Sequence, residues 1–396
     1  LQNKRYTHLA QNKRACACVS GTHTHAALCG AMGLDCAPRA VASPEKATRR
    51  PRCPKILKAG SDFSGMDAFS AALKRMKIPR GVLFASDTNV ARRKVLDTVH
   101  APRVIYEGVA EREADQYPST DLYVWTPPCQ DFSTIGKGSG KNGPQRAGAL
   151  MARAMKYIKV KQPRLTVMEN VKALTHAKHR PVVGGILKFL RDNNYEVFKN
   201  VLNAKHYGLP QERRRLVIVG IRKDCTKHPF RWPTVDMKTP SVATILDRQL
   251  PSDKPGRLPT KAREKERCQA AYERARGDGH DARKVNVMVD IDVSKKFQKF
   301  GVDMCKTLTR TRGGCGGPLA SMRGRRLTTA ELLRLQGFKP EGCPYQELGI
   351  SERQVGLMAG NAVPVNMAGV VLQEALWSAG LVMEKRISPR MSHVVA

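Results

Sequence analysis

The stretch Leu122-Tyr123-Val124-Trp125-Thr126-Pro127-Pro128-Cys129-Gln130 joins a short apolar run to two prolines and a cysteine. The run is β-rich, too short for a helix and ended by proline, so it predicts a buried strand. Similar short runs, each bounded by polar or turn residues, occur at 81–85, 165–168 and 216–219.

Helix-like segments at 68–77, 147–160 and 182–193 lie between these runs. Alternation of strands and helices predicts an α/β fold with a doubly wound, mainly parallel sheet. Such sheets bind ligands at the carboxyl ends of their strands. Functional residues should therefore follow the apolar runs directly.

The composition points to an anionic partner. The chain has 396 residues, enough for two domains or for one large catalytic domain with an insert, and 41% of them are hydrophobic. Its net charge of +35 favours nucleic acid over the alternative of a solvated basic surface. No apolar run approaches the roughly 18–20 residues that span a bilayer, so no membrane partner is expected.

Residues 1–54 are basic, rich in small residues and without periodicity, so we expect a disordered segment, with an organelle transit peptide as the alternative. Six Cys and His side chains in it match no usual zinc-ligand spacing, and we predict no metal site. They are Cys16, Cys18, His23, His25, Cys29 and Cys36. The odd total of 11 cysteines favours a reducing compartment.

The alternation stops after residue 225. We predict a first catalytic part at 55–225 and a basic insert at 226–306. A segment at 307–383 ends the insert and returns to the catalytic part, and 384–396 is a tail. Within the insert, Lys261–Arg276 predicts a charged helix, which fits either a recognition segment or a solvated helix in a long loop.

Cys129 is the candidate nucleophile. It follows a predicted strand, two prolines restrict the backbone before it, and the glycines Gly136, Gly138, Gly140 and Gly143 behind it suggest a mobile lid. A lone cysteine is more often an inert buried thiol, but this context is unusual for one. Glu169, directly after the run 165–168, would lie on the same edge and supply a proton donor.

Two further motifs have weaker meanings when taken alone. Gln211-Glu212-Arg213-Arg214-Arg215 precedes the run 216–219 and is either a phosphate-binding patch or the source of one guanidinium in the site. The turn Ser61–Phe69 follows a predicted first strand at 55–58, opens a helix and can hold a carboxylate-bearing cofactor. Asp87 follows the second strand, the usual place for an acid that binds a ribose hydroxyl.

Taken in order, these motifs resemble the cytosine-C5 DNA methyltransferase family over about residues 55–225 and 305–380. Thr307-Leu308-Thr309, Arg325-Arg326-Leu327-Thr328, Glu331, Leu335-Gln336-Gly337-Phe338 and Gly360–Val365 also match. The resemblance implies a Rossmann-like S-adenosylmethionine-dependent methyltransferase domain with a small inserted target-recognition segment. It also implies methylation of C5 of a cytosine flipped out of duplex DNA.

The resemblance assigns roles residue by residue. Cys129 would attack C6, Glu169 would protonate or hydrogen-bond N3, Arg215 would contact the base carbonyl, and Arg213 would be its structural partner. Residues of the lid or the substrate contact would be Gln130, Ser133, Gly136 and Gln211. S-adenosyl-L-methionine would be held by Phe63, Ser64, Gly65, Asp87, Glu107, Pro127, Asn361 and Val363.

The sequence departs from the family's first motif at two positions. Ser61 stands where an acid is usual, and Asp67 stands where a second glycine is expected. Glu107 replaces the family's adenine-binding Asp. The alternatives are a tRNA cytosine-C5 methyltransferase, although its Cys-Phe-Thr element is missing here, and a catalytically impaired nucleic-acid-binding relative. We expect a monomer in the nucleus, with an organelle or a bacterial-type cytoplasm as alternatives.

Overall fold

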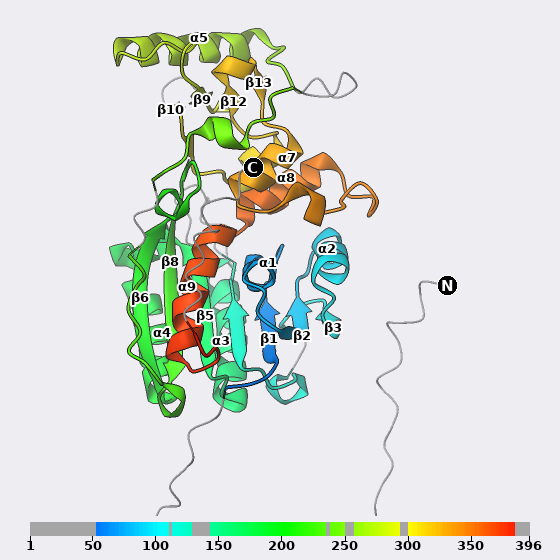
Figure 1. Cartoon of the computed structure of the whole chain (residues 1–396), viewed down its shortest axis with the longest axis vertical. Helices are drawn as coiled ribbons and strands as arrows, with labels where there is room; N and C mark the ends of the chain where they lie inside the picture. Colours follow the sequence, from blue (N-terminus) through cyan, green and yellow to red (C-terminus); the bar gives the residue numbers. More distant parts are fainter. Residues whose placement is uncertain are drawn as a thin grey trace, which may run out of the picture. The chain divides into compact units, whose positions relative to one another are not determined.

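The computed structural model describes residues 53–110, 113–128, 143–234, 238–249, 257–293 and 300–384, with residues 143–147 as backbone only. These residues all belong to one compact unit, residues 50–396 (Figure 1). The predicted disordered segment 1–54, except for its last two residues, and the tail from residue 385 onward lie outside the described residues.

A seven-stranded sheet with the order β3-β2-β1-β4-β5-β8-β6 forms the centre. Neighbouring strands from β3 to β5 are parallel, whereas β8 runs antiparallel to both β5 and β6. The strands are β1 (Leu57–Asp62), β2 (Arg80–Ser86), β3 (Val104–Tyr106), β4 (Leu122–Trp125), β5 (Leu165–Val171), β6 (Tyr195–Asn203) and β8 (Arg214–Arg222). Because the parallel strands run the same way, their carboxyl ends share one edge.

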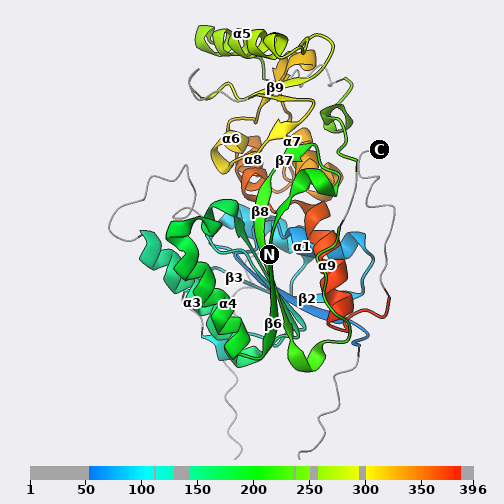
Figure 2. The ribbon, with the colours of Figure 1, turned by 90° about the vertical axis from the view of Figure 1, so that its left-hand side faces the viewer.

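Helices cover both faces of this sheet (Figure 2). One face packs against α3 (Gly143–Lys161) and α4 (Arg180–Asp192), in a core that includes Trp125 and Met168. The other face packs against three helices in a second core. These are α1 (Ala68–Arg75), α2 (Val90–His100) and α9 (Val365–Ser378). Burial on both faces explains why the central strands are continuous apolar runs.

The predicted α/β fold is confirmed, and the predicted runs at 81–85, 122–125, 165–168 and 216–219 lie in β2, β4, β5 and β8. The expected boundaries of the first strand were wrong: it covers 57–62 and not 55–58. The sequence pattern did not predict its polar end as strand. Asp62 is buried there and accepts hydrogen bonds from Ser86 Oγ and Tyr123 Oη, at 2.5 and 2.7 Å. A buried polar side chain needs such partners, and sequence pattern does not show them.

A second, four-stranded antiparallel sheet has the order β10-β9-β12-β13. Its strands are β9 (Val287–Val289), β10 (Phe300–Val302), β12 (Leu319–Ala320) and β13 (Arg325–Arg326). The charged helix α5 (Ala262–Gly277) packs on it through Cys268, Ala271 and Ala275. The rest of this helix faces solvent, in agreement with its low apolar content.

Three helices and a pair of short strands connect the two sheets. They are α6 (Arg310–Gly314), α7 (Thr329–Leu335), α8 (Glu352–Asn361), β7 (Gln211–Glu212) and β11 (Cys305–Lys306). Helices α6 and α8 approach so closely that a Cβ on Gly313 would lie 1.9 Å from the Gly356 carbonyl oxygen. Only glycine permits that approach.

The stretch Gly360–Val365 ends one helix and begins the next. Asn361 is the last residue of α8, and α9 begins at Val365. The intervening Pro364 stops one helix and caps the next, since its ring cannot continue α8. No single described helix is long and apolar enough to cross a membrane, and α8 with α9 passes that test only as a pair bent by 41°.

Candidate active site

Glu169 and Arg215 form an ion pair at the carboxyl end of β5. Antiparallel pairing sets Glu169 opposite Val217 and Val171 opposite Arg215, so the two charged side chains come from adjacent strands, two residue positions apart in the register. Arg215 Nε lies 3.0 Å from Glu169 Oε1, and the two side chains are only 10% and 9% exposed. A guanidinium is thus held against a carboxyl group at the edge where the sheet would bind a ligand.

Burial dominates the electrostatics of this pair. Desolvation raises the pKa of Glu169 above its usual value, whereas the positive charges of Arg215 and Arg213 oppose that shift. A carboxyl group with a raised pKa keeps its proton to higher pH, which is the property required of an acid that works near neutrality.

Arg213 is fully buried and bridges three parts of the chain. Its Nη1 donates to the Leu308 carbonyl at 2.5 Å, and its Nη2 donates to the carbonyls of Gly360 and Ala362 at 3.1 and 2.7 Å. The acceptors lie in two segments distant in sequence, so Arg213 joins the connection between β7 and β8 to the chain before α6 and to the end of α8. The predicted role of Arg213 as the structural partner of Arg215 stays a prediction.

Gln211 is buried as well, which corrects the substrate contact that we predicted. Its Nε2 donates to the Leu335 carbonyl at 3.1 Å, and its Oε1 accepts from the Leu308 amide at 3.1 Å. Its side chain is therefore engaged with the protein interior at both ends. Its position in a polar, arginine-rich stretch suggested exposure, but its side-chain amide bonds to the last residue of α7 and to the segment before α6.

The segment before the candidate nucleophile is held in place, although Cys129, Gln130, Ser133 and Gly136 themselves lie outside the described residues. Thr126 Oγ1 donates to the Phe63 carbonyl at 2.8 Å, and Asn170 Nδ2 donates to the Pro127 carbonyl at 3.2 Å. We had not singled out Thr126 or Asn170 as positioning residues. The chain leading to Cys129 is thus attached both to the loop after β1 and to the residue that follows Glu169.

The loop after β1, residues 63–67, turns sharply and is called the cradle below. Phe63 and Gly65 both adopt left-handed backbone conformations, with φ of 58° and 59°. Ser64 is buried: its Oγ donates to the Ser61 carbonyl at 3.0 Å and accepts from the Ser86 amide at 3.0 Å. These two hydrogen bonds attach the cradle to β1 and β2.

Asp67 explains how the loop forms without a second glycine. Its φ of 46° is the left-handed conformation that glycine usually supplies, and aspartate tolerates it better than most residues. Its side chain caps α1 by accepting from the Ser70 amide at 2.9 Å and also accepts from the Ser70 and Ser61 hydroxyls at 2.7 and 3.2 Å. The two departures from the family motif therefore contact each other.

Substitutions at Asp67 should separate these two contributions. Asp67→Ala loses the cap and strains the backbone, so we expect it to lower the free energy of unfolding by about 2–3 kcal/mol. Asp67→Gly relieves the strain and should cost about 1 kcal/mol, and Asp67→Asn should cost least. Denaturant unfolding measures the series, and equal losses for the alanine and glycine variants would contradict the strain argument.

Asp87 lies buried directly after β2. Its Oδ2 accepts from the Gly65 amide at 3.0 Å, and its Oδ1 accepts from the Asn89 amide at 2.9 Å. Arg92, which we had not predicted, pairs with it at 3.2 Å. Asp87 thus connects the cradle to the second strand and places a carboxylate beside it.

The other predicted cofactor residues differ in their burial. The Glu107 side chain is 83% exposed and pairs with Arg93 at 2.8 Å. Asn361 is exposed at the end of α8, whereas Pro127 and Val363 are buried. These residues lie at the ends of four different elements, β3, β4, α8 and the α8–α9 connection, so only the fold relates them.

Comparison with known proteins places this geometry in a family. The family model described as C-5 cytosine-specific DNA methylase matches residues 57–377. The type II methyltransferase M.FnuDI of Fusobacterium nucleatum is 29% identical over 177 residues, which is 45% of this chain and 50% of that protein. M.MthTI of Methanothermobacter thermautotrophicus is 25% identical over 311 residues, covering 72% and 88%. The chain spans about half or less of the length of several of the curated relatives it matches.

Solved structures share the fold at low sequence identity. The S. pombe Dnmt2 methyltransferase superposes with a TM-score of 0.60 at 15% identity, covering 81% of this chain and 98% of that one. An E. coli prophage protein described as a putative DNA modification methyltransferase gives 0.59 at 17% identity, covering 81% and 98%.

Proposed function

The chain belongs to the C-5 cytosine-specific DNA methylase family, and from this premise we propose that it transfers a methyl group from S-adenosylmethionine to C5 of cytosine in duplex DNA. The observation that carries the proposal is the buried Glu169–Arg215 pair, beside the tethered segment that leads to Cys129. The family and its fold imply S-adenosylmethionine as the donor and DNA as the substrate. The net charge of +35 suits such a polyanion.

The proposed reaction begins with Cys129. Its thiolate attacks C6 of the cytosine, forming an S–C6 bond and moving the C5–C6 π electrons toward C5. Pro127 and Pro128 restrict the backbone before the thiol, and Asn170 holds Pro127 near the end of β5. The ring face must be open to this attack, so the base is flipped out of the duplex.

Glu169 and Arg215 then act on the polar edge of the base. Glu169 donates a proton or a hydrogen bond to N3, which stabilises the negative charge that thiolate attack sends into the ring. Arg215 contacts the base carbonyl and keeps Glu169 oriented through the 3.0 Å pair. After C5 is methylated, a base removes the C5 proton, the S–C6 bond breaks, and the thiolate is regenerated.

The described loop residues fit the methyl donor. S-adenosylmethionine supplies an electrophilic methyl group on a sulfonium when bound. Phe63 offers a partly exposed ring, Gly65 an open backbone and Asp87 a buried carboxylate for the ribose hydroxyls. Asn361, Val363, Glu107 and Pro127 complete the proposed set, in which the exposed Glu107 would contribute least.

Asp87→Ala should weaken S-adenosylmethionine binding by about 10- to 100-fold, since hydrogen bonds to a charged group are each worth roughly 1.5–3 kcal/mol. Glu107→Ala, which removes the same charge at an exposed position, should weaken binding by less than about 3-fold. Isothermal titration calorimetry with S-adenosylmethionine measures both. Equal losses for the two variants would argue against Asp87 as the ribose ligand.

Methyl transfer itself tests the function. The whole chain is incubated with methyl-labelled S-adenosylmethionine and either duplex DNA or tRNA, and the product is digested to locate 5-methylcytosine. Label in DNA supports the proposal. Label in tRNA alone would replace it with the RNA alternative, and cofactor binding without transfer to either substrate would indicate a catalytically impaired relative.

A further inference from the structure

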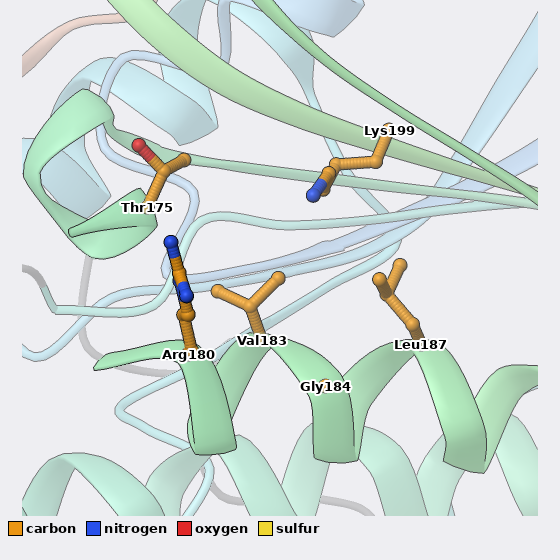
Figure 3. Close-up of a pocket in the computed structure, with 6 residues that line it drawn as sticks. All are labelled: Thr175, Arg180, Val183, Gly184, Leu187 and Lys199. Carbon is orange, nitrogen blue, oxygen red and sulfur yellow. The ribbon is translucent and has the colours of Figure 1, made fainter. Parts of the chain in front are cut away.

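A pocket of about 370 Å³ opens between α4, β6 and the loop that follows β5 (Figure 3). Its lining residues are Thr175, Arg180, Val183, Gly184, Leu187 and Lys199. Arg180, Gly184 and Leu187 recur at helical spacing and so share one face of α4. Lys199 approaches from the edge strand β6. The pocket is formed by groups that the proposed reaction does not use.

Two cations define the chemistry of this pocket. Figure 3 shows the Arg180 side chain rising from α4 toward Thr175, while the Lys199 ammonium extends over the same helix face. Both residues are exposed, and within the described part of the chain neither makes an ion pair with a carboxylate. No acidic residue lines the pocket. Two like charges converging without a counter-ion favour an anion between them.

Glycine in the pocket floor is a second observation. Gly184 and Gly185 lie in the middle of α4, are exposed, and have open space where a Cβ would stand. Glycine disfavours a helix more than any residue except proline. No contact within the described structure requires glycine at these two positions. At Gly184, the missing side chain lets an external group approach the helix backbone between the two cations.

The position of the pocket relates it to the proposed active site. Lys199 pairs across the sheet with Ile218, and Ile218 pairs with Met168, the residue before Glu169. Two strand spacings, roughly 10 Å, separate the backbone of Lys199 from that of Met168. Lys199 projects to the α4 face of the sheet, whereas Glu169 projects to the opposite face. The loop from β5 to α4 carries Lys172, His176, Lys178 and His179 and leads from the edge near Glu169 to Arg180.

We propose that this pocket binds a backbone phosphate of the DNA flanking the target cytosine, clamped between Arg180 and Lys199 over Gly184. The proposal rests on the proposed function, because it takes DNA as the substrate. The duplex backbone carries a phosphate every few ångströms along each strand, so a strand engaged at Glu169 presents a series of phosphates along the sheet edge from which the β5–α4 loop leads to Arg180. The pocket contributes affinity and register, and it carries no base readout.

Binding of a fluorescent 24-base-pair duplex at several salt concentrations tests the clamp. We expect Arg180→Ala/Lys199→Ala to bind about 10-fold more weakly at low salt and to depend less steeply on salt, since each lost phosphate contact lowers the log–log slope by about 0.9. Gly184→Ala should weaken binding as well, even though alanine stabilises the helix, because its methyl group occupies the pocket floor.

Two matched variants serve as controls. Gly185→Ala makes the same helix-favouring change next door without lining the pocket, and Lys188→Ala removes a cation of α4 that pairs with Asp192. Both should bind the duplex as the unmodified chain does. The proposal is overturned if Gly184→Ala and Gly185→Ala behave alike, or if the double variant keeps the original salt slope.

Failure of this clamp differs from failure of the proposed function. A chain that methylates DNA while the double variant shows an unchanged salt slope refutes the clamp alone. A chain that binds no duplex DNA refutes both. Weaker tRNA binding by the double variant with unchanged duplex binding overturns the assignment to DNA and gives the pocket to RNA phosphates.

Discussion

Glu169→Gln is expected to lower kcat for DNA methylation by about 10²- to 10⁴-fold, the usual contribution of a positioned acid. Glutamine keeps the size of the side chain and can still donate a hydrogen bond, but it has no proton to transfer. The burial that raises the pKa of Glu169 and its 3.0 Å contact with Arg215 are the features that suit it to the task. KM should change little, since the interaction strengthens only in the transition state.

The pH dependence of kcat tests the role of Glu169 in a second way. A carboxyl group with a raised pKa is protonated below that value and loses its proton as the pH rises through it. If the protonated form is required, kcat of the unmodified chain falls on the alkaline side, and Glu169→Gln removes that decline. Glu196→Gln, the same change on β6, is the control and should leave both rate and profile unchanged. A Glu169→Gln variant with normal kcat would exclude the proposed acid.

The central sheet was predictable because burial on both faces produces short apolar runs, which sequence shows directly. The residues at the strand ends followed from the same rule, so Glu169, Asp87 and the approach to Cys129 were placed correctly on one edge. The polar half of β1 was not predictable, because Asp62 becomes compatible with the interior only through Ser86 and Tyr123. Neither partner is near it in sequence.

The arginine-rich stretch shows a different limit. Three consecutive arginines look alike in sequence, but β-strand alternation and the neighbouring segments give them different surroundings. Arg213 is buried among carbonyl groups, the Arg214 side chain is 50% exposed, and Arg215 faces Glu169. Gln211 was assigned to the substrate from the resemblance, since the sequence does not show that its side chain bonds to the Leu335 carbonyl in α7. Motif order therefore identifies the family more securely than it identifies each residue's partner.

Cys129→Ser should abolish methyl transfer, with a loss of at least about 10³-fold. A cysteine is a few per cent thiolate at neutral pH, whereas a serine hydroxyl is essentially never ionised and is a far weaker nucleophile toward C6. Neither S-adenosylmethionine binding nor duplex binding should change by more than about 2-fold, since the substitution replaces one small side chain. The separation of binding from turnover is what distinguishes a nucleophile from a residue that only supports the fold.

DNA carrying 5-fluorocytosine makes the covalent step visible. Fluorine at C5 blocks the final removal of a proton, so the bond between Cys129 and C6 persists after methyl transfer and the complex survives denaturing electrophoresis. We expect this adduct with the unmodified chain and with Cys53→Ser, which removes a half-buried thiol outside the matched residues 57–377. Cys129→Ser should form none. An adduct that persists in Cys129→Ser would assign the attack to a different nucleophile and would exclude Cys129 from that role.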